Sequence, residues 1–147
     1  MRNVFLAVLA LVLFGCSSDD DGAITNLDLE LLYGQWYNVG LCREQNSLLL
    51  NENGTFETFS SNAVDCDNTE LDTYKITGNY TINGNFYNTS NEVAELVIDG
   101  SGLSIFEATN LNIKREIIGL TETTLIIKVF EEDANIITVF GEFEYEH

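Results

Sequence analysis

Few side chains in this sequence could carry catalysis. The only histidine is His147 at the end of the chain, where we expect disorder, so histidine catalysis is not predicted. Of the three cysteines, Cys16 is expected to carry a lipid, and Cys42 and Cys66 are expected to form a structural disulfide, which leaves no thiol nucleophile. The 24 carboxylates could include a hydrolytic pair, but no pair is distinguished by its neighbours. We therefore predict that the protein is not an enzyme.

The densest group of possible metal ligands is DCDNTELD, residues 65–72. Its oxygen-bearing side chains, which would suit Ca²⁺, are Asp65, Asp67, Asn68, Glu70 and Asp72. The segment lacks the glycine that an EF-hand loop has at its sixth position. We expect a solvated loop and predict no metal and no cofactor, with Ca²⁺ binding as the open alternative.

Residues 1–15 have the pattern of a bacterial secretory signal peptide. One basic residue, Arg2, precedes an apolar run over residues 4–14. The run is shorter than the roughly 20 residues that span a bilayer as a helix. Residues 13–16, LFGC, resemble a lipobox, the motif whose cysteine becomes lipid-modified and N-terminal. We expect cleavage before Cys16 and acylation, for example with palmitate, at Cys16.

Charge restricts the partners of the chain. Six Lys and Arg face 24 Asp and Glu, a formal net charge of −18, so nucleic acid is not an expected partner. Anionic lipid headgroups would also repel it, and membrane contact must come through the acyl anchor. Residues 16–25 contain SSDDDG, which predicts a flexible, solvated tether. We expect an envelope lipoprotein anchored to the outer membrane, with surface exposure left open.

Lipidation of Cys16 resolves an odd cysteine count. Cys42 and Cys66 then remain as a pair in an oxidising compartment, where we expect a structural disulfide. It would close a loop of roughly 25 residues, for which loop-closure entropy gives about 3 kcal/mol. The remaining chain, residues 26–147, has the length of one domain.

That domain is predicted to be almost entirely β. A short helix is expected from an N-cap at Asn26 to a stop at Gly34. Beyond it, short alternating runs are separated by Asn-Gly and Asp-Gly steps, which suit tight hairpins. Residues 47–59 and 74–87 form the clearest hairpins. About eight strands follow, joined by short connections, which predicts an antiparallel up-and-down barrel or a sandwich.

The order of motifs resembles one family. Gly34-Gln35-Trp36 after a short helix resembles the opening of the lipocalins, in which the helix plugs one end of the barrel and the Trp packs over it. LLLNENGTF, GNYTINGNF and IIGLTETTLIIKV follow in the order found in the lipocalin-like domain of Bacteroidetes-type secreted lipoproteins. In the same lipoproteins an acidic tag after the lipidated cysteine marks surface export. The resemblance implies a barrel over residues 26–147, with Arg115 or Lys128 as the cation that covers Trp36.

Inward-facing aromatic residues are the candidate ligand contacts. Strand alternation and the resemblance select Trp36, Tyr74, Tyr80, Phe143 and Tyr145. An eight-stranded barrel is wide enough either to be filled by its own side chains or to hold one small ligand. We expect a monomeric envelope lipoprotein that binds a small hydrophobic or amphipathic molecule. The alternative is a filled, ligand-free module that docks another envelope protein.

Overall fold

The computed structural model describes residues 27–61, 63–67, 70–100, 113–133 and 136–147. The predicted signal peptide, Cys16, the tether and the predicted N-cap Asn26 lie outside these residues, as does Asn68 of the acidic loop. Along the chain follow α1 (Leu29–Leu32), β1 (Gly34–Asn38), β2 (Ser47–Leu50), β3 (Thr55–Ser60), β4 (Thr73–Asn83), β5 (Phe86–Ile98), β6 (Ile113–Leu120), β7 (Thr124–Asp133) and β8 (Ile136–Glu146). No helix in this described part of the chain is long and apolar enough to cross a membrane.

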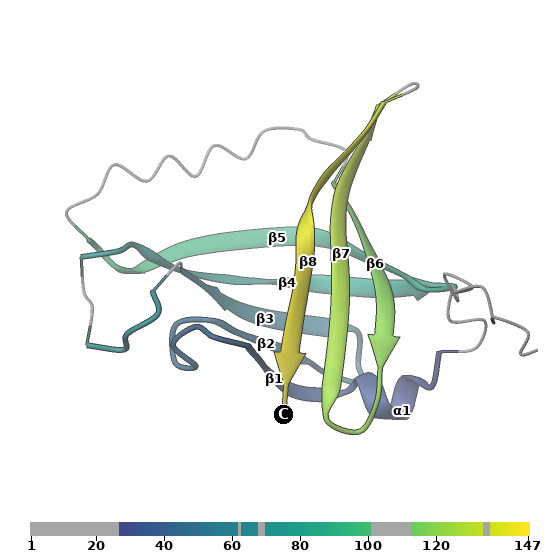
Figure 1. Ribbon diagram of the computed structural model, residues 1–147, viewed down its shortest axis with the longest axis horizontal. Coiled ribbons are helices and arrows are strands. Elements are labelled where there is room, and N and C mark those ends of the chain that lie inside the picture. The colour runs from purple at the N-terminus through teal and green to yellow at the C-terminus, as the bar shows by residue number, and fades with distance from the viewer. Residues whose placement is uncertain (1–26, 62, 68–69, 101–112, 134–135) are drawn as a thin grey trace, which may run out of the picture.

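The eight strands form one closed antiparallel ring. Each strand pairs with its neighbour in sequence, and β8 returns to pair with β1 (Figure 1). The prediction of an all-β up-and-down barrel with a short N-terminal helix is thereby confirmed. The hairpins follow from the turn residues: Gly54 and Gly84 have φ of 79° and 63°, a left-handed conformation that glycine adopts without steric cost.

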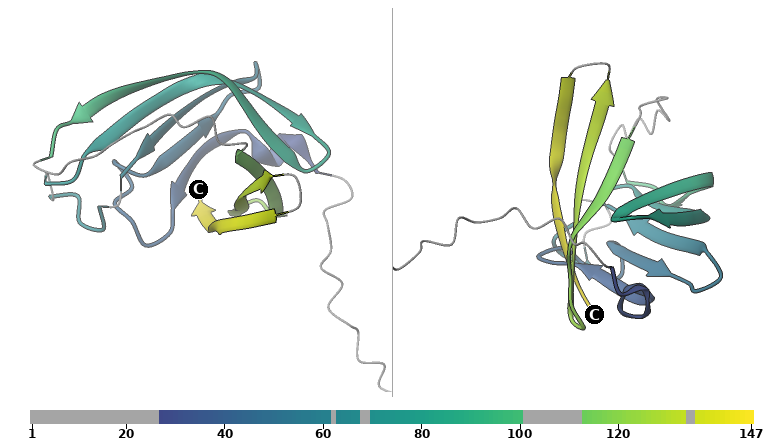
Figure 2. Two further views of the ribbon diagram at one scale, coloured as in Figure 1. Left: turned by 90° about the horizontal axis from the view of Figure 1, so that it is seen from above. Right: turned by 90° about the vertical axis from the view of Figure 1, so that its right-hand side faces the viewer.

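The ring is unevenly joined. β4 and β5 pair over nearly their whole length, whereas β5 meets β6 at only two residue pairs, Phe86 with Glu116 and Tyr87 with Arg115. β1 likewise meets β8 only through Tyr37 and Asn38. Figure 2 shows the result: β1–β5 and β6–β8 are two blades that meet at one end and diverge toward the other.

The hydrophobic core lies where the two blades meet. Alternate residues of each strand face it, as strand geometry requires. Its buried members come from α1 and all strands except β8: Leu32, Trp36, Leu48, Leu50, Phe56, Tyr80, Tyr87, Ile117, Leu125 and Ile127. Beyond this core β8 is exposed on both faces. A bulge between its pairings with Val129 and Phe130 interrupts the period-two alternation of β8, because one extra residue reverses the faces beyond it.

The helix begins later than predicted. Asp28, rather than Asn26, is the N-cap of α1, and its Oδ1 accepts a hydrogen bond from the Glu30 amide at 3.1 Å. Both residue types can cap a helix. Asp28 does so because the chain is still extended at this residue, with ψ of 101°, directly before the first helical residue Leu29. α1 thus has only four residues, enough to place Leu32 over the core.

Gly78 allows β3, β4 and β5 to approach closely. A Cβ at this position would lie 2.8 Å from Phe56 Cε1 and 2.8 Å from the carbonyl oxygen of Ser90. We expect Gly78→Ala to lower the free energy of unfolding by about 1–3 kcal/mol, because the Ser90 backbone cannot move aside cheaply. Urea denaturation measures this. Gly119→Ala is the control, because it meets only the Ile126 side chain. Equal losses in the two variants would contradict the steric explanation.

Candidate functional site

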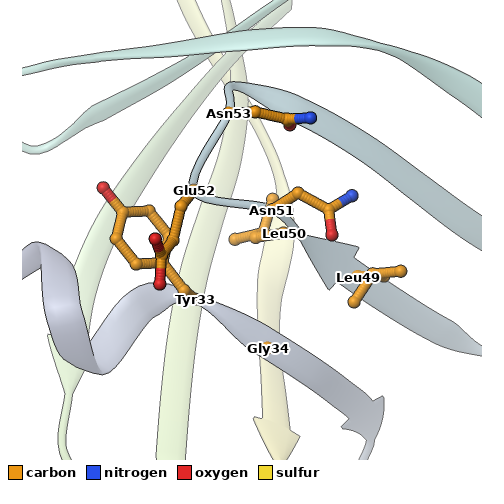
Figure 3. A pocket seen from close by; sticks show the side chains of 7 residues that line it. All are labelled: Tyr33, Gly34, Leu49, Leu50, Asn51, Glu52 and Asn53. Atoms are coloured by element: carbon orange, nitrogen blue, oxygen red, sulfur yellow. The ribbon is translucent and has the colours of Figure 1, made fainter.

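Among the described residues, two places have features of a ligand-binding site. One is a surface pocket of about 520 Å³ beside α1, lined by Tyr33, Gly34, Leu49, Leu50, Asn51, Glu52 and Asn53 (Figure 3). It lies between the start of β1 and the β2–β3 turn, and the side chains of Glu52 and Asn53 are exposed. This pocket is open to water and has no cation in its lining. The second place, inside the ring, has the more unusual chemistry.

The interior site is formed by tyrosines around one arginine. Tyr80 on β4 and Tyr87 on β5 are diagonal neighbours across the two strands, with ring centroids 5.5 Å apart. Tyr87 is also edge-on to Phe56, at 6.2 Å. Arg115 is the register partner of both Tyr87 and Val129, so its side chain lies on their inward face. Its Nη1 donates to Thr89 Oγ1 at 3.1 Å.

Two of the three tyrosine hydroxyls of this site have hydrogen-bond partners among the described residues, and the third has none. Tyr80 Oη donates to the Asn51 carbonyl at 2.8 Å, and Tyr145 is hydrogen-bonded to the side chain of Asn38. Tyr87 Oη is buried and has no hydrogen-bond partner among the described residues. Buried hydroxyls are nearly always hydrogen-bonded, so the unpaired hydroxyl of Tyr87 distinguishes this site from the rest of the core.

Burial shifts the acidity of all three phenols. It raises the pKa of Tyr80 to about 12, with smaller contributions from Tyr33 and Glu52. Burial likewise raises the pKa of Tyr87 and of Tyr145, and in both cases the Arg115 guanidinium opposes the rise. All three hydroxyls are therefore protonated donors at neutral pH.

The same shifts predict alkaline unfolding. Above pH 10 the unfolded chain releases tyrosine protons that the folded chain retains, so the folded state loses stability as pH rises. We expect the free energy of unfolding to fall steadily between pH 10 and 12, and to fall less steeply in Tyr87→Phe. Denaturant unfolding at successive pH values measures the slope. A flat profile, or the same slope in Tyr87→Phe, would contradict this explanation.

The structure brings together three of the five predicted ligand contacts. Trp36 and Tyr80 are buried in the core, and Tyr145 packs against it. Tyr74 is half-buried and pairs with Ser60 and Leu96, away from the core cluster. Phe143 pairs with Ile127 but is 38% exposed. The interior site therefore gathers Tyr80 and Tyr145 with two residues absent from the predicted set, Tyr87 and Arg115.

The expectation of a disordered His147 is wrong. Its ring stacks on Trp36 with centroids 3.7 Å apart, and its Nδ1 lies 2.9 Å from the carbonyl oxygen of Gln35. The predicted cover of Trp36 by Arg115 or Lys128 is also wrong. The guanidinium of Arg115 lies close enough to Tyr87 and Tyr145 to oppose the rise in their pKa. Lys128 lies in register with Glu116 and Glu142. His147 reaches Trp36 because β8 ends beside β1.

The predicted disulfide is present. Cys42 and Cys66 are bonded, with Cα atoms 5.0 Å apart. Two carboxylates of the acidic loop next to Cys66 accept hydrogen bonds from backbone amides: Asp65 from Asp67 at 3.0 Å, and Asp72 from Gly100, outside the loop, at 2.7 Å. Within the described ranges, no three His, Cys, Asp or Glu side chains are grouped so that they could hold a metal ion.

Comparison with known proteins adds no relative. No protein-family model matches the chain, and no curated protein or solved structure shows significant similarity to it. The assignment of function therefore rests on the residues and geometry described above.

Proposed function

We propose that this chain is a lipid-anchored protein of the bacterial cell envelope, whose lipocalin-like barrel binds a small hydrophobic or amphipathic molecule without chemical turnover. The closed ring of eight antiparallel strands supports the barrel part of the proposal. The lipobox-like residues 13–16 support the anchor, and the Cys42–Cys66 disulfide suits an oxidising compartment outside the cytoplasm.

The observation that carries the binding function is the unpartnered hydroxyl of Tyr87. A barrel filled only for its own stability would place phenylalanine here, because a buried hydroxyl without a partner is costly. Tyr87 also forms the last residue pair of the β5–β6 seam, after which the two strands separate. A ligand bound at the end of this seam would supply the hydrogen-bond partner that the Tyr87 hydroxyl lacks.

Native mass spectrometry of the full chain, purified from the envelope of its host, tests the proposal. We expect additional mass that leaves on denaturation, whereas covalent lipid on Cys16 would stay with the protein. Tyr87→Phe, which keeps the ring and removes the hydroxyl, should reduce the fraction of protein that carries the additional mass. Protein that carries only covalent lipid in every preparation would contradict ligand binding.

The anchor has its own test. Cys16→Ala removes the acylated side chain and should move the protein from the membrane fraction to the soluble fraction. Continued sedimentation of this variant with membranes would contradict the lipoprotein assignment.

A second candidate function, docking to another envelope protein, is favoured by the exposed edges of the two blades. β5 and β8 carry large apolar side chains in water beyond the core: Val93, Leu96, Val97, Ile136, Ile137, Val139, Phe140 and Phe143. Apolar side chains on incompletely paired strands favour strand addition by a partner. Ile137→Lys should abolish capture of such a partner from envelope extracts, whereas Tyr87→Phe should leave capture unchanged.

A further inference from the structure

We propose that the ligand is an amphipathic molecule with a singly charged carboxylate, and that Arg115 and Tyr87 bind this carboxylate inside the ring. The inference rests on the proposed binding function and specifies its ligand class. Its central observation is Arg115, a cation on the inner face of the ring that forms no ion pair with any described carboxylate, although the protein is strongly acidic.

Arg115 and Lys128 are the two cations of the described chain that form no ion pair with a described carboxylate. Lys128 lies in register with Glu116 and Glu142 on the outer face of the ring, whereas Arg115 lies on the inner face, in register with Tyr87. Arg43, Lys75 and Lys114 form ion pairs with Glu146, Glu57 and Glu132, respectively. Arg115 forms no ion pair with any described carboxylate, although the full chain has 24 acids against six basic residues. A half-buried guanidinium with a single hydrogen bond to Thr89 retains most of its five donors for another group.

The orphan hydroxyl lies at the same place. Tyr87 is only 4% exposed, and it is the direct cross-strand partner of Arg115. Directly opposed residues on one face have Cβ atoms roughly 5 Å apart, so a single carboxylate is small enough to contact both side chains. Because burial keeps Tyr87 protonated, its hydroxyl can donate while the guanidinium supplies the charge.

The surroundings favour one negative charge attached to an apolar body. Glu92 acts electrostatically on Tyr87 and adds a negative charge near the site, which disfavours a dianion such as a phosphate monoester. Apolar side chains continue the same interior face: Val129 is the β7 partner of Arg115, and Phe56 contacts the Tyr87 ring. A carboxylate with an aliphatic chain matches this combination.

A headgroup comparison on the full chain tests the inference. The probes are 11-(dansylamino)undecanoic acid and its methyl ester, which share the same tail and fluorophore. At pH 7.4 we expect the acid to bind about tenfold to hundredfold more tightly than the ester, the range expected for charge-assisted hydrogen bonds. Millimolar acetate or phosphate should not displace the acid.

Two pairs of variants locate the effect. Arg115→Gln should reduce the affinity for the acid to that for the ester, and Arg115→Lys should recover part of it because the charge remains without the guanidinium fork. Lys114→Gln is the matched control, since it removes the same charge one residue away on the opposite face, where Lys114 pairs with Glu132. Tyr87→Phe should weaken acid binding about threefold to tenfold and leave ester binding unchanged.

The outcomes show whether this inference fails alone or together with the broader binding function. Tight, equal binding of acid and ester would overturn the carboxylate assignment and leave the binding barrel in place. Binding of neither probe would overturn both. Displacement by acetate or phosphate alone would show a site for small anions and overturn the amphipathic ligand. Because the acid and ester are compared on the unaltered protein, the test holds even if Arg115→Gln fails to fold.

Discussion

Replacing Trp36 with alanine is expected to lower the free energy of unfolding by about 3–5 kcal/mol, the range for removing a large buried aromatic side chain. Trp36 has no exposed surface and lies in the core among residues from α1 and the β-strands. Its Nε1 donates to the Leu32 carbonyl at 2.9 Å, which holds the last turn of α1 on the ring. Alanine would therefore leave a cavity and an unpaired carbonyl at the point where the helix meets the sheet.

Urea denaturation followed by circular dichroism measures this loss, because Trp36 is the only tryptophan and its fluorescence disappears in the variant. Trp36→Phe is the control. It keeps an aromatic ring but removes the indole donor, and should cost less than half as much. His147→Ala removes only the stacked ring and should cost the least. A cost of Trp36→Ala below about 1 kcal/mol would contradict the role of Trp36 as the centre of the core.

Replacing both Cys42 and Cys66 with alanine should lower the free energy of unfolding by about 3 kcal/mol, because the unfolded chain regains the freedom of a loop of 24 residues. The native fold should persist. Asn46 joins the same two loops by donating to the carbonyls of Cys42 and Ala63 at 3.1 and 3.2 Å, and by accepting from the Ser61 amide at 3.1 Å.

Reducing agent provides the internal control for the disulfide. It should destabilise the natural chain by about the same amount and have no effect on the Cys42→Ala, Cys66→Ala double variant. Equal stability of the oxidised and reduced natural chain would contradict a stabilising disulfide.

Much of the fold was predictable because local signals and strand periodicity agree. Asn53-Gly54 and Asn83-Gly84 lie at the turns of the two predicted hairpins. Alternate residues of the strands that flank these turns belong to the core. The uneven ring was not predictable. Bulges near Asn91 on β5 and near Gly141 on β8 shift the register, and a shift of one residue moves every later side chain to the other face.

The candidate site was predictable only in part, for the same reason. Tyr87 was missed because its face depends on the turn before it. A two-residue turn at residues 84–85 places Tyr87 opposite the inward Ile82. The length of this turn is the feature of the sequence from which the inward position of Tyr87 could have been predicted. Arg115 alternates with the buried Ile117 and is therefore inward. No local pattern shows that Arg115 lacks a carboxylate partner, because that depends on the whole ring.

The narrow seam between β1 and β8 also determines the order in which the ring assembles. The other seams join strands adjacent in sequence, whereas the contact of His147 with Gln35 spans 112 residues. Closing so long a segment costs more chain entropy than forming any hairpin. The hairpins should thus form first and the ring close last. Because His147 stacks on the single tryptophan only after closure, stopped-flow fluorescence of Trp36 would time that final step.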